Sequence, residues 1–240
     1  RYNMDIHNYD KRYQAALRQV QNADIPERNK QLILDFGKDL ILEGASKPRL
    51  LRYHNVLKIV AQLLGKEFDK AEVADIKGIV ATIQQRRDYS PWTKQAYKII
   101  IRRFYKWLAG TKNFPPIVDW ITIGVKRSEK PLPSEGDLLS ENDIQKILHV
   151  ANHPRDKAMI AMLWESGARI SEIGNLKLCN VEFDEHGTLI SVRGKTGSRK
   201  IRLMYSTQFL SIWISMHPFR SNKDAQLWIN IGTTNHNKPM

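Results

Sequence analysis

Apolar residues return every three or four positions through the first half of the chain, which is the period of an amphipathic helix. The spacing predicts four helices, over residues 28–43, 48–64, 71–87 and 90–110. The fourth has the clearest bounds, because Ser90 is a good N-cap, Pro91 a good first residue and Gly110 a good end. The first half is therefore expected to be a helical domain.

Residues 113–137 interrupt the periodicity. They contain several Pro and Gly residues and remain basic, so they predict a linker, with a domain boundary near Pro133. Residues 1–27 are polar and mixed in charge, with only a weak sign of a short helix. We expect four segments: an N-terminal extension at 1–27, a helical domain at 28–112, the linker, and a second domain at 138–240.

The second domain combines helices with short strands. Ser140 opens a predicted helix, with Asp143 completing a near capping box, and an apolar run from Ala158 to Trp164 predicts a helix buried on almost every side. Strands are predicted at 189–192 and 201–203, a helix at about 207–217 and a possible strand at 227–229. The Gly-rich, basic residues 193–200 are expected to form the tip of a hairpin.

Charge indicates the class of partner. The formal net charge is +13 and the pI is about 9.8. Residues 86–130 hold eleven Lys or Arg against three acidic residues, and part of this charge lies along one side of the fourth helix. A solvated face is the plain alternative, but such an imbalance favours a phosphate backbone, and neither end shows the amphipathic helix typical of membrane binding. The candidate DNA contacts are Lys94, Lys98, Arg102, Arg103, Lys106, Lys126, Arg127, Arg193, Arg199 and Lys200.

Several other classes of site are disfavoured. The lone Cys179 excludes a disulfide framework within the chain and a cysteine zinc site, and it fits a reducing, cytoplasmic setting. No apolar run is long enough for a membrane span, and no signal peptide is visible. His149 and His153 lack the glutamate of a zinc protease, and a phosphate loop would need Gly at position 189, which is Leu.

Arg169 and Glu172 are the strongest chemical candidates. Gly167 is expected to end the buried helix, and Ile170, Ile173 and Leu176 then begin a second helix at once. This places Arg169 at a tight turn, with the carboxylate of Glu172 able to reach back over the same face. A guanidinium held in this way is suited to a phosphate or a carboxylate, although an ordinary surface ion pair is the plainer interpretation.

The motif A-R-I-S-E-I at 168–173, followed by G-K-T-G at 194–197, resembles the catalytic domain of the tyrosine recombinases, which include phage-type integrases, Xer proteins and archaeal relatives. The resemblance implies a mainly α fold. It would consist of a helical SAM-like core-binding domain and a partial α+β catalytic domain with a small β-hairpin sheet. It also implies that the two domains together close around duplex DNA.

The resemblance implies roles for three residues. Arg169 would stabilise charge on the scissile phosphate, Glu172 would hold the geometry, and Lys195 would donate a proton to the departing 5′ oxygen. The intact enzyme would cut DNA through a 3′-phosphotyrosine bond, which conserves the phosphodiester energy and needs neither metal nor nucleotide cofactor. A basic hairpin tip that only touches phosphate remains the alternative for Lys195.

The family's later groups are a His-x-x-Arg motif, a further His or Trp, and the tyrosine nucleophile. None is found after the hairpin, since His217-Pro-Phe-Arg220 comes too early. We therefore expect this chain to bind DNA without cleaving it, as a monomer or weak dimer, whereas the intact enzyme would act as a homo-tetramer on DNA. A naturally short, non-catalytic protein that occupies recombination sites is the alternative function, and a basic helical adaptor is a third.

Overall fold

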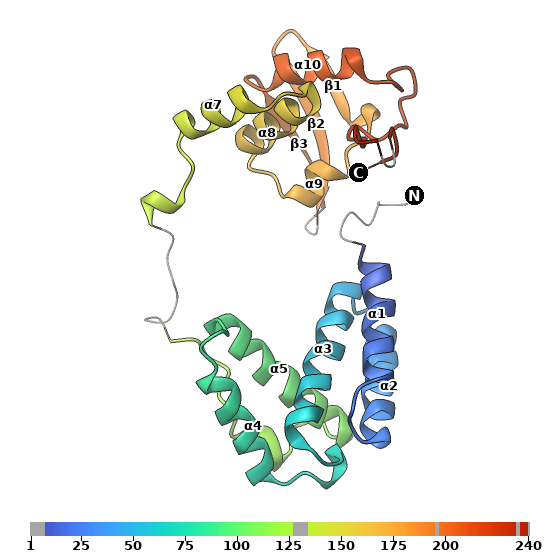
Figure 1. The fold of residues 1–240 in the computed structure, drawn as a ribbon, viewed down its shortest axis with the longest axis vertical. Helices are drawn as coiled ribbons and strands as arrows, with labels where there is room; N and C mark the ends of the chain where they lie inside the picture. The colour runs from blue at the N-terminus through green and yellow to red at the C-terminus, as the bar shows by residue number, and fades with distance from the viewer. Residues whose placement is uncertain (1–7, 127–133, 195–196, 234–235, 240) are drawn as a thin grey trace. The chain divides into compact units, whose positions relative to one another are not determined.

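The computed structural model describes residues 8–126, 134–194, 197–233 and 236–239. They form two compact units, which we call the helical unit (residues 8–126) and the α/β unit (residues 134–239) (Figure 1). Each unit has its own hydrophobic core. The predicted fold class, mainly helical with a small sheet, is confirmed.

α3 lies at the centre of the helical unit, because it packs against α1, α2, α4 and α5 (Figure 1). The four predicted helices are present with their ends within a few residues of the expected positions. The elements of this unit are α1 (Tyr9–Gln21), α2 (Glu27–Leu42), α3 (Lys47–Leu64), the 3-10 helix η1 (Phe68–Lys70), α4 (Val73–Gln85), α5 (Pro91–Leu108) and α6 (Pro116–Asp119).

The helical unit extends past both expected bounds of residues 28 and 112. α1 belongs to its core, since Ala16 and Val20 are buried and the helix packs against α3. On the other side, Val118 and Ile121 are buried in the same core, so the start of the expected linker is packed structure. Pro116 lies within the expected linker, but it occupies the first turn of α6, where its missing N–H costs nothing.

Aromatic side chains hold α5 in place. The ring of Phe104 is fully buried, and its centroid lies 4.6 Å from that of Phe68 and 5.5 Å from that of Phe36. Trp107 packs against the same cluster, and its indole N–H donates to Asp39 Oδ2 at 2.7 Å. Each such aromatic pair adds about 0.5–1.5 kcal/mol beyond the area that it buries. This Trp therefore serves packing.

The α/β unit places a three-stranded antiparallel sheet, in the order β1-β2-β3, against short helices. α8 packs on α10 and β3, and α9 packs on β2 (Figure 1). The elements are the 3-10 helix η3 (Glu135–Asp137), α7 (Glu141–Val150), α8 (Pro154–Ser166), α9 (Ile170–Gly174), the 3-10 helix η4 (Leu178–Asn180), β1 (Val181–Asp184), β2 (Gly187–Gly194), β3 (Gly197–Leu203) and α10 (Thr207–Met216).

Three expectations for this unit were wrong. β2 runs to Gly194 and β3 begins at Gly197, so most of the expected hairpin tip is paired strand. Charged residues are compatible with these strands because their outward-pointing side chains face solvent. Residues 227–229 are buried, but around them the structure has only isolated bridges. α8 is not buried on every side, since Trp164 is 42% exposed.

Candidate functional site

The turn between α8 and α9 is built as its sequence predicted. Gly167 ends α8 in the left-handed conformation, with a φ of 56°, which a residue with a side chain adopts only at a cost. Arg169 then forms the N-cap position of α9, and Ile173 and Leu176 anchor the following segment in the core. Ile170 was expected to be buried with them, but it is half exposed.

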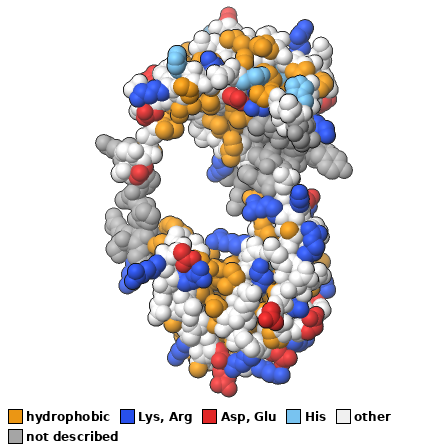
Figure 2. Space-filling view, in the orientation of Figure 1, with side chains coloured by type: hydrophobic (Ala, Val, Ile, Leu, Met, Phe, Trp, Pro, Cys, Tyr) orange, Lys and Arg blue, Asp and Glu red, His pale blue; other side chains and the backbone are white. Residues whose placement is uncertain are grey.

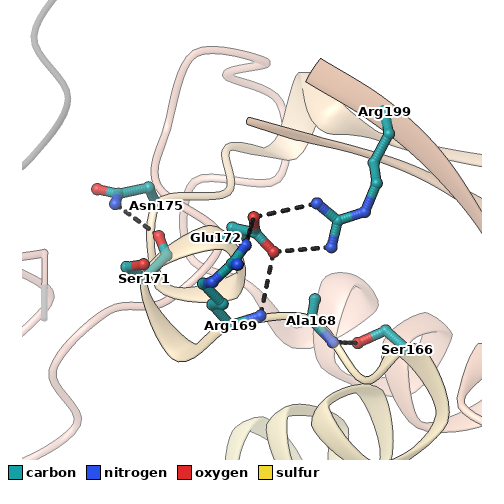
Figure 3. Close-up of polar contacts among 7 residues, drawn as sticks. All are labelled: Ser166, Ala168, Arg169, Ser171, Glu172, Asn175 and Arg199. Atoms are coloured by element: carbon teal, nitrogen blue, oxygen red, sulfur yellow. Dashed lines mark hydrogen bonds and ion pairs between the residues drawn. The ribbon is translucent and has the colours of Figure 1, made fainter. Parts of the chain in front are cut away.

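Glu172 is the centre of the site, and its carboxylate accepts four hydrogen bonds (Figure 3). Arg199 on β3 binds it with both guanidinium ends, Nη1 to Oε1 at 3.0 Å and Nη2 to Oε2 at 2.8 Å. The backbone N–H of Arg169 donates to Oε2 at 3.0 Å, and Arg169 Nη1 donates to Oε1 at 3.2 Å. We call these three residues the Glu172 cluster.

The Glu172 carboxylate remains ionised across the physiological range. Its side chain is only 1% exposed, and a buried carboxylate needs partners that offset the loss of hydration. The hydrogen bond from Arg199, followed by that from the backbone of Arg169, lowers the pKa of Glu172 from 4.5 to about 2. Glu172 in turn raises the pKa of Arg199. The cluster therefore holds one negative and two positive charges.

The guanidinium of Arg169 differs from that of Arg199 in its surroundings. The Arg169 side chain is 64% exposed and makes a single bond to the carboxylate, whereas Arg199 uses both of its Nη atoms on Glu172. Arg169 therefore presents most of its five donors to solvent, where an anionic oxygen can bind them. The predicted proximity of Arg169 and Glu172 is confirmed.

The hairpin reaches the same site from the sheet. The backbone of Gly194 lies so close to Glu172 that a Cβ on this residue would be 1.9 Å from Oε1. The close approach, and not a turn, is what requires glycine here. Lys195, the expected proton donor, lies outside the described residues, as does Thr196.

Strand alternation separates the hairpin cations that the sequence had grouped. Arg199 is paired across the ladder with the buried Val192, so its side chain points to the inner face of the sheet, toward Glu172. Arg193 and Lys200 point to the outer face and are exposed. Lys200 has only a 3.8 Å ion pair with Glu182, and Arg193 has no partner in the described part of the chain. The two outward cations remain candidates for phosphate contacts.

The basic side of α5 is partly occupied by contacts within the helical unit. Arg102 places its guanidinium 3.9 Å from the centre of the Phe114 ring, and Lys106 lies 5.3 Å from it. Arg103 pairs with Glu43. These side chains line an open cavity of about 530 Å³, whose wall also includes Phe36, Ile99, Trp107 and Ile123.

The remaining predicted cations of this region are distributed along the unit. Lys94 Nζ donates to the carbonyl of Gln84 at 2.7 Å. Lys98 is half-buried and Lys126 is exposed; neither has an ion-pair partner among the described residues, and Arg127 lies outside them. On the face seen in Figure 2, Lys and Arg side chains are interspersed with polar and apolar surface and do not form one stripe.

The other sequence candidates have structural roles. His217 is fully buried; its Nδ1 accepts from the Phe219 N–H at 3.1 Å, and its Nε2 therefore donates to the Gln226 carbonyl. His153 caps α8 by accepting from the Arg155 N–H. Among the residues that the structure describes, no three His, Cys, Asp or Glu side chains are placed to hold a metal, and no helix is long and apolar enough to cross a membrane.

The α/β unit matches a known family. The model of the phage integrase family matches residues 137–240. In these residues the chain is similar to the phage integrase family. Its relatives include tyrosine recombinase XerA of Pyrococcus horikoshii, 25% identical over 71% of this chain and 54% of the relative. Tyrosine recombinase XerD of Ralstonia nicotianae is 26% identical over 75% of this chain and 59% of the relative. The chain thus spans little more than half the length of these Xer relatives, and the resemblance seen in its motifs is confirmed.

Two solved recombinase structures share the fold of this chain. XerH bound to its difH substrate before cleavage aligns with a TM-score of 0.57 at 14% identity, over 94% of this chain and 72% of that one. XerH bound to a palindromic difH substrate after cleavage aligns with a TM-score of 0.59, also at 14% identity, over 95% and 73%. At this identity the match speaks for the fold alone.

Two contributors to the site were missed from the sequence. The sequence could have indicated the bond from Arg199 to Glu172, because alternate residues of a strand face the same side. Arg199 alternates with Ile201 and the buried Leu203, so its side chain belongs to the inner face. Glu165 had none. Its carboxylate accepts from the backbone N–H groups at the start of α10, at positions 204–206, and so fixes the end of α8 just before the Arg169 turn.

Proposed function

We propose that this chain takes part in site-specific DNA recombination by a tyrosine recombinase, with duplex DNA as its partner, and that by itself it binds DNA without cleaving it. Arg169 would contact the scissile phosphate and Lys195 would protonate the departing 5′ oxygen, as the family resemblance implies. Glu172 would position Arg169. The homology to Xer recombinases and the net charge of +13 support this assignment.

The observation that carries the proposal is the state of Arg169. Its guanidinium is largely exposed on a rigid turn, and the carboxylate beside it is already bound at both oxygens by Arg199. A phosphate oxygen arriving at this turn would meet donors that are fixed in place and need no reorganisation, which is how an enzyme stabilises developing charge.

We further propose that the helical unit also binds the duplex, through cations without ion-pair partners. Lys98 and Lys126 are the clearest in this unit. On the sheet, Arg193 and Lys200 serve the same purpose, although Lys200 has a long ion pair of 3.8 Å with Glu182. With Arg169 this makes five contacts. Because each neutralised phosphate releases condensed counterions, the logarithm of the affinity should fall with the logarithm of salt concentration with a slope of roughly −4.5.

The test is fluorescence anisotropy of a labelled duplex with this chain over a range of salt. We expect Arg169→Gln to make the slope less negative by about 0.9, because one phosphate contact is lost. Lys11→Gln removes an exposed cation on α1 that is not among the proposed contacts, and as the matched control it should leave the slope unchanged. A wild-type affinity that does not depend on salt would refute the DNA-binding proposal.

Cleavage is a separate arm of the same test. Cleavage next to a nick releases a short DNA fragment that diffuses away. Because this fragment cannot then reverse the reaction, any covalent protein–DNA bond accumulates. We expect this chain to bind the nicked duplex without forming an adduct. A covalent adduct in a denaturing gel would contradict that expectation and would place a nucleophile within the chain.

A further inference from the structure

Arg199 and Lys200 are neighbours in sequence and face opposite sides of β3. Both were candidates for DNA contact. Arg199 is on the inner face with Glu172, and Lys200 is on the outer face, 60% exposed. Arg199 and Lys200 are both long cationic side chains, but they occupy different environments because they face opposite sides of β3.

The bond between Arg199 and Glu172 is of the strong type. It is bidentate, with both distances between 2.8 and 3.0 Å, and the carboxylate is almost entirely removed from water (Figure 3). A planar guanidinium matches the two oxygens of a carboxylate in this arrangement, whereas a lysine would satisfy one of them. An Arg199 that left Glu172 to bind a phosphate would leave a buried carboxylate with one partner fewer.

The contact with Gly194 adds a steric constraint. The Glu172 carboxylate lies against this residue so closely that a Cβ would be 3.0 Å from Cδ as well as overlapping Oε1. Arg199 fixes the carboxylate from one side and the Arg169 backbone N–H fixes it from another. The end of β2, the start of α9 and β3 are thus joined at one carboxylate.

The charges determine what remains for a ligand. With one carboxylate and two guanidinium groups, the Glu172 cluster carries a net charge of +1. Arg199 compensates Glu172, so the charge of Arg169 stays available to an anion. Without Arg199, Arg169 would be the only cation at the carboxylate, would be drawn into a closer pair with it, and would have its charge cancelled.

We propose that Arg199 is a positioning residue that acts through Glu172 and Arg169, and that it does not itself contact DNA. It holds the carboxylate against Gly194 and neutralises it, which keeps the Arg169 guanidinium charged and open to a phosphate. The inference rests on the proposed function in one respect, namely that the anion at Arg169 is a DNA phosphate.

The test compares the wild-type 240-residue chain with a single and a double variant by duplex anisotropy between about 50 and 200 mM salt. In Arg199→Gln, we expect the salt slope to become less negative by about 0.9, because Glu172 captures Arg169. Glu172→Gln combined with Arg199→Gln should restore the wild-type slope, since no carboxylate remains to hold Arg169. A direct contact from Arg199 to DNA predicts instead that the double variant stays as low as the single one, and that result would overturn the proposal.

Lys200→Gln is the matched control on the outer face. It should also make the slope less negative by about 0.9, but adding Glu172→Gln should not reverse the loss. If Glu172→Gln restored the slope both in Arg199→Gln and in Lys200→Gln, the loss of any negative charge would restore binding. That result would contradict a specific link between Arg199 and Glu172. Arg199→Lys should give an intermediate slope, because a lysine can neutralise Glu172 without the bidentate geometry. An unchanged slope in Arg199→Gln would also overturn the proposal.

Amide hydrogen exchange separates this inference from the function on which it rests. If the wild-type chain shows no salt-dependent affinity for DNA, the proposed function fails, but the link from β3 to α9 is still measurable. Exchange in residues 170–174 should be faster in Arg199→Gln than in Lys200→Gln. Equal exchange in the two variants would show that Arg199 does not position α9.

Discussion

Glu165 fixes the end of α8 just before the Arg169 turn, and its replacement by Gln gives a sharp test. Oε1 accepts from the N–H groups of Met204 at 2.6 Å and Tyr205 at 3.0 Å, while Oε2 accepts from the Ser206 N–H at 2.8 Å and from its hydroxyl at 2.5 Å. A glutamine keeps one acceptor oxygen. Its amide group then faces the buried Ser206 N–H, which loses its partner.

A buried N–H without an acceptor costs about 1–3 kcal/mol, so we expect Glu165→Gln to destabilise the α/β unit by about 2 kcal/mol. For a unit of this size, that corresponds to a decrease in Tm of roughly 10 °C. The assay is calorimetric unfolding, with hydrogen exchange of residues 203–210 assigning the transition to this unit.

Glu185→Gln is the matched control. Glu185 lies in the turn between β1 and β2, its side chain is 85% exposed, and its ion pair is with the neighbouring His186. Its replacement should change the free energy of unfolding by less than about 0.5 kcal/mol. If the two variants melted together, the hydrogen bonds to Glu165 would not be holding the start of α10, and the reasoning would fail.

Two further predictions concern the helical unit. Gly37→Ala should destabilise it by about 1–3 kcal/mol, because a Cβ there would lie 2.6 Å from the ring of His54, whereas Gly78→Ala, also within a helix but facing open space, should stabilise it by about 0.4–1 kcal/mol. Urea unfolding of both variants measures the difference, and equal effects would contradict the close contact. Burial lowers the pKa of His54 below its ordinary 6.5, so the unfolded chain takes up this proton first and stability should fall as the pH drops below about 6.5. Urea midpoints at about pH 7.5 and 5.5 should therefore differ more in the wild type than in His54→Leu; equal shifts would show that another group is responsible.

The elements of this fold were largely predictable because their signals are local. Ser90 caps α5 and Ser140 caps α7 as expected, each through a side-chain oxygen that accepts from a backbone N–H three residues on. Gly167 ends α8 as its position indicated. Apolar periodicity and capping act over one or two turns of chain, and both can be read without knowledge of the tertiary structure.

The site was predictable in its motif and not in its connections. Arg169 and Glu172 are three residues apart on one short element, so their contact follows from helical geometry. The bond from Glu172 to Arg199 and those from Glu165 to the start of α10 join segments that are distant in sequence, and no local pattern specifies them. The basic side of α5 was interpreted as a surface for DNA phosphates for the same reason, since Phe114 covers Arg102 only through the tertiary fold.

The contact between Gly194 and Glu172 also constrains how this chain can change by mutation. The two residues share one small volume, so a side chain gained at position 194 would have to be accompanied by a shorter acid at position 172. Position 194 can then gain a side chain only after the acid at position 172 has become shorter, so the order of substitutions matters. Shortening the acid first leaves a gap that a methyl group can fill, whereas adding the methyl group first displaces the carboxylate. The tolerated sequences of the hairpin are therefore set in part by a residue on a helix, before any demand of DNA chemistry is added.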